Sequence, residues 1–297
     1  MQVFRPRLWG CAVAAVLLLA GRGTAQGPTI SSSSVGYIDP AIPASMFRLR
    51  FDAAYNDSVP DRGGFLMPRT LGAGLPLAES RVDYQDLSAY LEYTLEPRFS
   101  LFAEVPFRMM NPEVNKDYSG LSDVSAGFKW ALIYERGLVT TLQCLIRAPT
   151  GDGRLGLGVD HVTVEPALLA HLGFDNGFTL ESEFHFSTPI GGEPGFTSNV
   201  IRYGLGLGYD LYRDDDLMLT PVVEAVGWTF LDGKKTLLDA DDSTTVVSAS
   251  GDTIVNLKAG LRFGVIGFGD LYVGYGRALT GTTRYADIYR VEWRLLY

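Results

Sequence analysis

A histidine and a serine two residues apart are the residues of this chain whose types and spacing could do covalent chemistry. They are His185 and Ser187 in the segment EFHFST, and Asn199 follows. Side chains two apart on a β-strand point to the same face. His185 could therefore act as a base toward the Ser187 hydroxyl, with Asn199 orienting the imidazole. Whether it does depends on what that face of the strand meets.

The elements that carry these residues are predicted to be β-strands, because large apolar residues alternate with polar ones from residue 46 to the last. Each segment is near the roughly 9–11 residues that a tilted strand needs to cross a bilayer. Their connections alternate between short and long, which is typical of transmembrane barrels. The twelve segments are 46–55, 87–95, 98–108, 121–133, 138–149, 161–172, 178–189, 200–212, 217–231, 253–265, 270–279 and 285–297.

Charge decides which face of these strands meets lipid. Ten basic and ten acidic residues share one phase, and the opposite phase is almost entirely apolar or aromatic. An Arg or Lys facing lipid at mid-depth costs about 2–4 kcal/mol, so the charged set must face an enclosed lumen. The residues that we predict to line the lumen, as a solute path or a salt-bridge lattice, are Arg48, Arg50, Glu92, Glu104, Arg108, Asp123, Lys129, Arg147, Glu181, Glu183, His185, Arg202, Lys258 and Arg262.

Two interpretations of these charges remain open. They form either a salt-bridge lattice that fixes strand register or a polar pathway that selects solutes. Equal numbers of acids and bases argue against strong selectivity for anions or cations. The same phase places His185 and Ser187 in the lumen, whereas a lipid hydrolase must present its serine to lipid. We therefore predict no enzyme activity, and the other histidines, His161 and His171, have no partners at metal-ligand spacing, so we predict no metal and no cofactor.

The N-terminal part of the chain precedes the predicted barrel. Residues 1–25 have a basic start, an apolar run and a small residue before Gln26, as in a cleaved secretory signal peptide. Without them the 25 basic residues fall by three to 22 against 34 acidic ones, a net charge of −12, which excludes a basic nucleic-acid face. Residues 26–45 are interpreted as a periplasmic or lumen-entering segment, and residues 46–297 as the barrel.

The chain ends on YRVEWRLLY, an alternating strand whose last residue is Tyr297. We expect it to pair with the first strand, so that no backbone edge is left in hydrocarbon. It resembles the signal that the bacterial outer-membrane assembly machinery reads. The expected location is the bacterial outer membrane, and the expected partners are its lipid and lipopolysaccharide, the assembly machinery and a small solute. The aromatics expected at the membrane interfaces are Tyr55, Phe107, Tyr209, Trp228, Phe230 and Tyr289.

Two stretches resemble the outer-membrane barrel family named for the MetA pathway of phenol degradation. GLSDVSAGFKWAL (120–132) is similar to a family strand opening, with Asp123 and Lys129 matching and Ser122 in place of a glycine. RAPTG (147–151) is similar to a Pro-Thr-Gly at a strand exit. The resemblance implies a channel for small, often aromatic or hydrophobic compounds, and no substrate residue carries over.

A second resemblance concerns the histidine–serine pair and the asparagine that follows it. His185, Ser187 and Asn199 are similar to the base, nucleophile and orienting residue of outer-membrane phospholipase A, itself a twelve-stranded barrel. The sequence thus predicts an all-β transmembrane antiparallel up-and-down barrel of about twelve strands that passes or binds small solutes, with loops 56–80 and 232–252 as gates. The alternatives are a structural or adhesive barrel with a closed lumen and, third, a lipid hydrolase.

Overall fold

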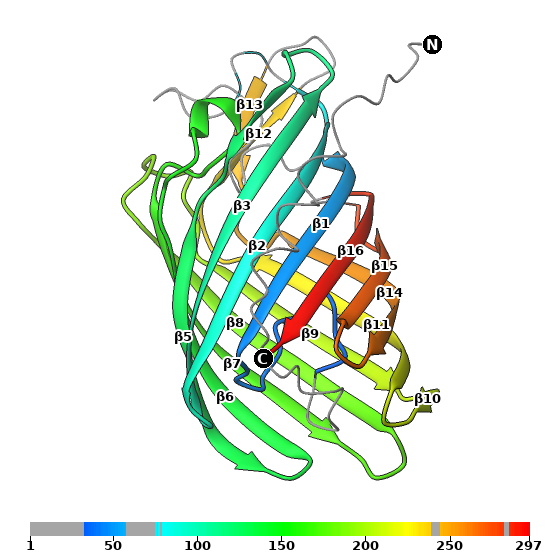
Figure 1. The fold of residues 1–297 in the computed structure, drawn as a ribbon. Coiled ribbons are helices and arrows are strands. Elements are labelled where there is room, and N and C mark those ends of the chain that lie inside the picture. Colours follow the sequence, from blue (N-terminus) through cyan, green and yellow to red (C-terminus); the bar gives the residue numbers. More distant parts are fainter. Residues whose placement is uncertain (1–32, 58–74, 76, 78, 239–243, 282–284) are drawn as a thin grey trace, which may run out of the picture.

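Twelve antiparallel strands close into a barrel, in which the last strand pairs with the first (Figure 1). The computed structural model describes residues 33–57, 75, 77, 79–238, 244–281 and 285–297. The predicted signal peptide, most of the predicted gating loop 56–80 and residues 239–243 of the predicted gating loop 232–252 lie outside the described residues. The barrel strands are β1 Met46–Asp57, β2 Val82–Glu96, β3 Phe99–Pro112, β5 Ser125–Glu135, β6 Leu138–Arg147, β7 Val162–Gly173, β8 Phe178–Ile190, β9 Val200–Tyr209, β11 Leu217–Phe230, β14 Thr253–Val265, β15 Gly269–Ala278 and β16 Asp287–Leu296.

The remaining elements lie at the ends of the barrel. β4 (Tyr118–Leu121) pairs with the end of β3, and β12 (Lys234–Leu238) forms a hairpin with β13 (Thr244–Ser248). β10 (Tyr212–Arg213) pairs with the start of β11, and a single 3-10 turn covers Gly153–Leu155. The strand predicted over 121–133 is therefore divided, because the chain leaves the sheet between β4 and β5.

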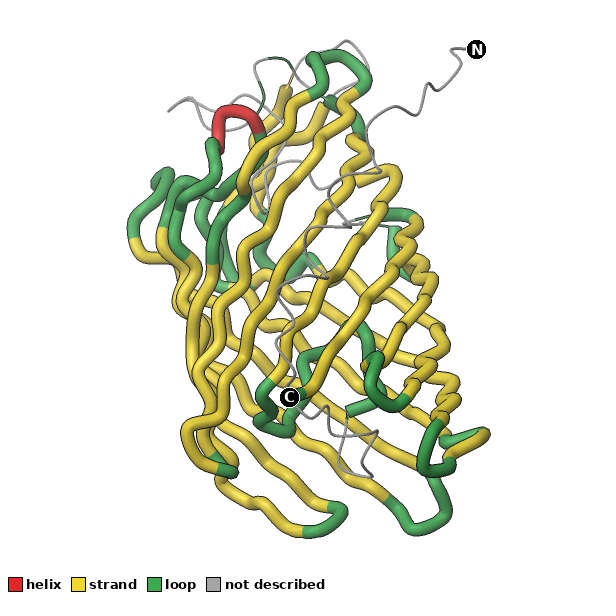
Figure 2. The backbone as a smooth tube through the Cα atoms, in the orientation of Figure 1, coloured by secondary structure: helices red, strands yellow, loops and turns green. Residues whose placement is uncertain are grey.

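The connections separate by length between the two ends of the barrel. The short turns, 97–98, 136–137 and 266–268 among them, lie at the end where the chain terminates, and the 3-10 turn and the β12–β13 hairpin lie at the other end (Figures 1 and 2). We call these ends the turn end and the loop end. The observed asymmetry is that of a barrel inserted from one side of a membrane.

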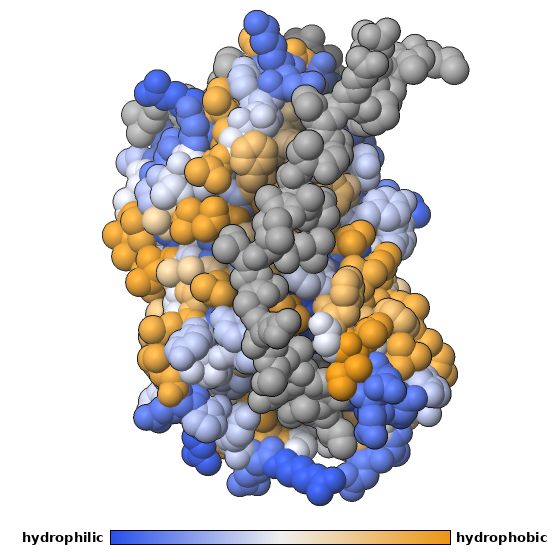
Figure 3. All heavy atoms as spheres, in the orientation of Figure 1, coloured by the Kyte–Doolittle hydropathy of each residue, from blue (hydrophilic) through white to orange (hydrophobic). Residues whose placement is uncertain are grey.

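The two faces of each strand have opposite chemistry. On β2 the Leu91 side chain is 50% exposed, and the adjacent Glu92 carboxylate is fully buried inside the barrel. Apolar side chains cover the flank of the barrel and hydrophilic ones gather at its two ends (Figure 3). The exposed apolar face and buried ionic face confirm the predicted transmembrane barrel. None of the described helical structure is long and apolar enough to span a membrane.

Aromatic side chains mark both ends of the seam where β1 meets β16. The Phe47 and Trp293 rings contact edge-on at 6.1 Å near the turn end, and Tyr55 and Tyr289 do so at 6.1 Å near the loop end. Eight residues separate the clusters on β1, about 26 Å along a strand, which at a strand tilt of about 40° spans roughly 20 Å of the apolar band of about 25 Å.

Two of the aromatics expected at the membrane interface instead face the lumen. Phe230 is 2% exposed, and Trp228 lines the central cavity. Both lie in phase with Glu224 on β11, which faces inward. The expectation was wrong because proximity to a strand end was given more weight than the phase set by that carboxylate.

Candidate functional site

Residues 33–45 lie inside the barrel and fill its lumen at the turn end (Figure 1). We call this segment the plug. Its apolar side chains are buried, with Val35, Ile38 and Ala41 exposed by 4%, 3% and 1%. Tyr37 packs edge-on against Tyr272 of the wall at 6.0 Å. The plug is thus an internal part of the fold.

Wall carboxylates satisfy the backbone N–H groups of the plug. A segment without regular secondary structure must find partners for these groups when it is buried, and ionised acceptors make the stronger hydrogen bonds. Glu224 accepts from Gly36, Tyr37 and Ile38 at 3.2, 2.8 and 2.9 Å, Glu181 from Ser34 at 2.9 Å, Glu183 from Asp39 at 2.8 Å and Glu92 from Ala44 at 3.2 Å.

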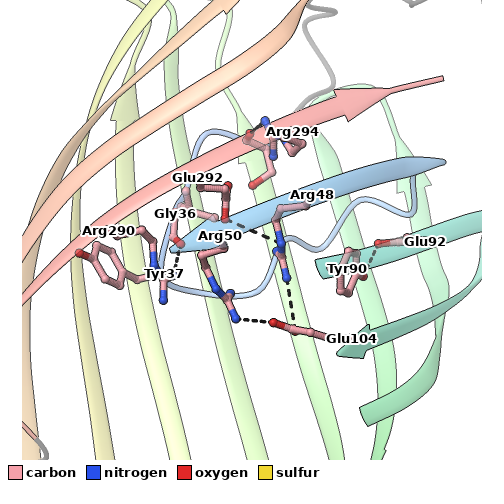
Figure 4. Close-up of polar contacts among 12 residues, drawn as sticks. Gly36, Tyr37, Arg48, Arg50, Tyr90, Glu92, Glu104, Arg290, Glu292 and Arg294 are labelled. Atoms are coloured by element: carbon pink, nitrogen blue, oxygen red, sulfur yellow. Dashed lines mark hydrogen bonds and ion pairs between the residues drawn. The ribbon is translucent and has the colours of Figure 1, made fainter. Parts of the chain in front are cut away.

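Wall arginines satisfy the plug's carbonyl groups in the same way. The Arg290 guanidinium donates to the Gly36 carbonyl and also binds Asp52, so it joins the plug to the β1–β16 seam (Figure 4). The other donations are Arg262 to the carbonyls of Ser34 at 2.9 Å and Val35 at 2.5 Å, Arg294 to Ser33 at 2.7 Å, and Arg202 to Tyr37 at 3.3 Å.

Inward-facing glycines on β9 make the space that the plug occupies. In the run YGLGLGY (203–209) the leucines face outward, and Gly204, Gly206 and Gly208 face the lumen. A Cβ added at any of these glycines would come within 3.0 Å of Ile38, Val35 or Ser34 respectively. The alternation of glycine with leucine was therefore a sequence signal for the plug, which the sequence reasoning did not use.

Above the plug the lumen holds two adjoining cavities. The central cavity is about 220 Å³, ends on Tyr37, Asp39 and Pro40 of the plug, and is lined by seven basic and four acidic side chains. The outer cavity is about 250 Å³ and lies toward the loop end. The two share the lining residues Arg50, Tyr84, Glu104, Ser125 and Arg147. Together they form a polar space that runs from the loop end to the plug.

Most of the predicted lumen residues lie in ion pairs along the wall, several of which are visible in Figure 4. Such ion pairs are what the salt-bridge lattice interpretation expects, since cross-strand pairs fix strand register. The pairs are Arg48 with Glu104 (3.6 Å) and Glu292 (3.8 Å), Arg50 with Glu104 (2.6 Å), Arg108 with Asp86 (2.8 Å), Lys129 with Glu92 (3.0 Å), Arg202 with Glu183 (2.9 Å), and Arg262 with Glu292 (2.9 Å) and Asp270.

Two predicted basic residues differ from the rest. Among the described residues, no carboxylate lies within 4.0 Å of Arg147 or Lys258. The Lys258 amine lies 4.1 Å from the ring centroid of Tyr37 and within 6 Å of those of Trp228 and Tyr285. Both cations line the central cavity.

Asp123 lines the outer cavity of the lumen but does not belong to a strand. It lies in the break between β4 and β5, where its carboxylate accepts from the amides of Gly151 at 2.9 Å and Val159 at 2.8 Å. It therefore fixes the connection between β6 and β7 at the loop end. Lumen acids that the sequence reasoning missed include Asp86, which the predicted strand start at 87 excluded, and Asp270.

The imidazole of His185 is held by two carboxylates. His185 Nδ1 lies 2.9 Å from Glu165, and its Nε2 lies 3.2 Å from Glu183. The Ser187 hydroxyl donates to Glu165 and so does not form the nucleophile–base bond that covalent catalysis needs. Asn199 instead binds the carboxylate of Asp232, at 2.7 Å through its amide N–H and 2.6 Å through its side chain.

One group of side chains has the spacing of a metal site. Ligand atoms of Asp39, Glu183 and His185 lie within 4.8 Å of one another. The Arg202 guanidinium, 2.9 Å from Glu183, already supplies positive charge there. Burial acts to raise the pKa of the Asp39 carboxyl, but the charges of Arg202, His185 and Lys129 and the hydrogen bond from Gln143 together outweigh it and hold that pKa well below its usual range. We interpret the group as an anchor of the plug.

Comparisons with known proteins identify the fold. No family model and no curated protein matches the sequence. An outer-membrane channel from Pseudomonas putida F1 superposes with a TM-score of 0.57 over 88% of this chain and 100% of that one, at 14% identity. The NanC porin (TM-score 0.49, 8% identity, 84% of this chain and 99% of that one) and the β-domain of the Bordetella autotransporter BrkA (0.48, 13%, 86% and 100%) also match. At such identities the likeness shows the barrel fold alone.

Proposed function

We propose that this chain is a bacterial outer-membrane channel that binds small solutes in its lumen and passes them when the plug moves. The observation that carries the proposal is the polar space that runs from the loop end and stops on the plug. A barrel with only a structural role has no need of a cavity above a separate, non-covalently held segment. The likeness to an outer-membrane channel supports the location and the class of function.

The way the plug is held is compatible with its release. Its anchors are charged side chains on the wall, and an opened lumen would fill with water that solvates them. Glu224 and Arg262 would then exchange plug amides and carbonyls for water. Such an exchange avoids the large penalty of leaving charged groups unpaired in a dry interior. A plug held by an apolar core alone would lack this compensation.

Further proposals come from the sequence. We propose that residues 1–25 are removed on export, that residues 26–45 form the periplasmic and lumen segment before the barrel, and that the terminal strand is read by the assembly machinery. The resemblance to the MetA-pathway family supports small aromatic or hydrophobic compounds as solutes.

The conductance of a plug-released barrel tests the channel. Replacing two plug anchors together, Glu181→Ala and Glu224→Ala, removes the acceptors of the hydrogen bonds from Ser34 and from residues 36–38. We expect stable conductance steps in planar bilayers from this variant and small or brief ones from the wild type. The matched control is Glu113→Ala, since that carboxylate is exposed and pairs with Arg81 at the loop end.

One outcome would favour the second candidate function. The hydrogen bonds along the plug are also what a permanently closed structural or adhesive barrel would have. A double variant that is folded, as judged by heat-modifiable electrophoretic mobility, but carries no current and allows no solute-driven liposome swelling would show that the lumen stays shut. The channel proposal would then be abandoned for the closed barrel.

A further inference from the structure

We propose that the central cavity is a binding site for small organic anions, in which Arg147 and Lys258 attract the anionic group. This inference rests on the proposed function only in that the solute must reach the lumen. It names the class of solute, which the balanced numbers of acids and bases in the sequence had left open.

The plug segregates the lumen charges. Four wall carboxylates, on Glu92, Glu181, Glu183 and Glu224, accept from plug amides, and none of the four lines the central cavity. The cavity lining keeps seven basic residues against four acidic ones; Lys129 and Arg202 among them are paired with Glu92 and Glu183 behind the lining, so the excess that is left belongs to Arg147 and Lys258. A cavity that is walled by protein of low dielectric focuses such an excess of charge on whatever enters it.

The four acids of the lining already have partners. Glu104 pairs with Arg50 at 2.6 Å, and Asp52 with Arg290 at 2.6 Å. Glu165 binds His185 at 2.9 Å, and Asp39 accepts from the Gln143 amide at 3.1 Å. The lining therefore offers an entering solute few free acceptors, and its unpaired charges are positive.

Lys258 is the deeper of the two unpaired cations. Its side chain is buried at 4% exposure, on β14. The carboxylate that the sheet register places opposite it, Glu224, points its oxygens at three plug amides instead. The lysine is left among the rings of Tyr37, Trp228 and Tyr285, which can stabilise its charge but do not neutralise it.

The plug itself supplies a hydrogen-bond donor beside Lys258. The Tyr37 hydroxyl is buried and has no hydrogen-bond partner among the residues that the structure describes. Tyr37 also lines the central cavity. An unpartnered buried donor is unfavourable unless a ligand or water accepts from it, and an anionic oxygen is the stronger acceptor.

Arg147 stands at the entrance to the central cavity. It belongs to the set of residues that line both cavities, and the strand register places it between the hydroxyl residues Ser125 and Thr163. Its guanidinium forms no hydrogen bond within the described part of the chain, so its fork of N–H donors can bind a carboxylate. β6 and β14 lie on opposite walls of the barrel, so the two cations flank the solute.

The rest of the lining fits an apolar body on that anion. Aromatic and aliphatic side chains complete the wall, and a volume of about 220 Å³ restricts the occupant to a single small molecule. We therefore commit to a small carboxylate with an apolar body as the class of solute. The apolar lining residues are Tyr84, Tyr90, Phe102, Leu145, Val226, Trp228, Tyr285 and Ile288.

Three probes of the same shape and different charge test this. Benzoate, benzyl alcohol and benzylamine are titrated into the full barrel in detergent by calorimetry. We expect benzoate to bind about tenfold more tightly than benzyl alcohol, and benzylamine to show no binding. Replacing Arg147→Gln or Lys258→Gln should weaken benzoate about tenfold and leave benzyl alcohol unchanged. Arg81→Gln, an exposed arginine outside the cavities, is the matched control.

The outcomes separate this inference from the proposed function. Equal affinities for the three probes, or benzoate binding that both cavity variants leave unchanged, would overturn the anion site. If Lys258→Gln does not fold, benzoate binding by variants of the half-buried Arg147 tests the site alone. Arg147→Lys is then expected to restore part of the benzoate affinity that Arg147→Gln loses. Charge-selective benzoate binding by a barrel that never conducts keeps the site and refutes the channel. Conductance by the plug-released barrel, together with equal affinities of the plugged wild type for the three probes, keeps the channel and refutes the site.

Discussion

Replacing Glu224 with glutamine should undock the plug from a barrel that is otherwise intact. The carboxylate accepts hydrogen bonds from the amides of residues 36–38 at 3.2, 2.8 and 2.9 Å. Glutamine keeps one neutral acceptor oxygen and directs an NH₂ group at the remaining donors. The Gly36 hydrogen bond is then lost, and those from Tyr37 and Ile38, which share the other carboxylate oxygen, lose their charge assistance. A charge-assisted hydrogen bond contributes about 1.5–3 kcal/mol and a neutral one about 0.5–1.5 kcal/mol, so docking weakens by about 3 kcal/mol. That loss corresponds to roughly a 100-fold change in the docking equilibrium.

Thiol protection measures this change directly. Cys144 is replaced by serine, and Val35, buried in the plug at 4% exposure, is replaced by cysteine, which is then the only cysteine in residues 26–297. A maleimide reacts with Cys at position 35 only when the plug undocks, so the labelling rate follows the undocked fraction. We expect Glu224→Gln to raise this rate about 100-fold and Glu113→Gln to leave it unchanged.

Two results would refute the reasoning. A labelling rate unchanged by Glu224→Gln would mean that these hydrogen bonds do not hold the plug. Fast labelling in the parent protein, before any change at Glu224, would mean that residues 33–45 do not rest in the lumen at all. Far-ultraviolet circular dichroism of each variant should show an unchanged strand content, which separates undocking from loss of the barrel.

Two further predictions concern the wall. Leu91→Arg places a charge on the lipid face and should destabilise the folded barrel in bilayers by about 2–4 kcal/mol. The control Leu237→Arg, on the exposed β12 hairpin, should leave the stability unchanged. Urea-dependent folding into vesicles compares the two variants, and equal effects would contradict the assigned faces. Arg262→Ala leaves Asp270 with Arg294 and Glu292 with Arg48 as their remaining cations and removes two donors to plug carbonyls, so it should cost about 1.5–3 kcal/mol in the same assay. A loss below 1 kcal/mol would mean that water replaces the guanidinium freely.

The barrel was predictable from the sequence because one free energy dominated, the cost of placing a charged side chain in hydrocarbon. Alternation over twelve segments set the elements, and the cost of a charge in hydrocarbon set their faces. The alternation pattern misplaced single residues where a hydrogen bond or the phase of the strand decided the position of the side chain. Asp123 fits the phase of its predicted strand, yet its carboxylate leaves the ladder to bind two amides of the β6–β7 connection. Trp228 is near a strand end, yet its phase turns it inward.

The plug was only partly predictable, because the sequence left residues 26–45 open between a periplasmic and a lumen-entering segment. Residues 33–45 have no period, and their partners lie far along the chain, as with Ser34 and Arg262. The side chains that bind it are ordinary lumen charges in sequence, since a glutamate that accepts from a backbone amide looks no different from one that pairs with arginine. The glycines of β9, whose missing side chains leave room for Val35 and Ile38, were the sequence signal for the position of the plug.

The balanced numbers of lumen acids and bases predicted a neutral pathway, and the structure shows why the inference was incomplete. A carboxylate keeps its negative charge when it accepts hydrogen bonds from amides, but its oxygens then point at the plug and not into the cavity, so it repels an entering anion less. Glu181 and Glu224 hold plug amides near the turn end, and Lys258, whose register partner is Glu224, is left facing the cavity. Moving the plug would return those carboxylates to the lumen and lower its affinity for an anion. A closed barrel should therefore hold the solute more tightly than an open one, so that opening and release occur together.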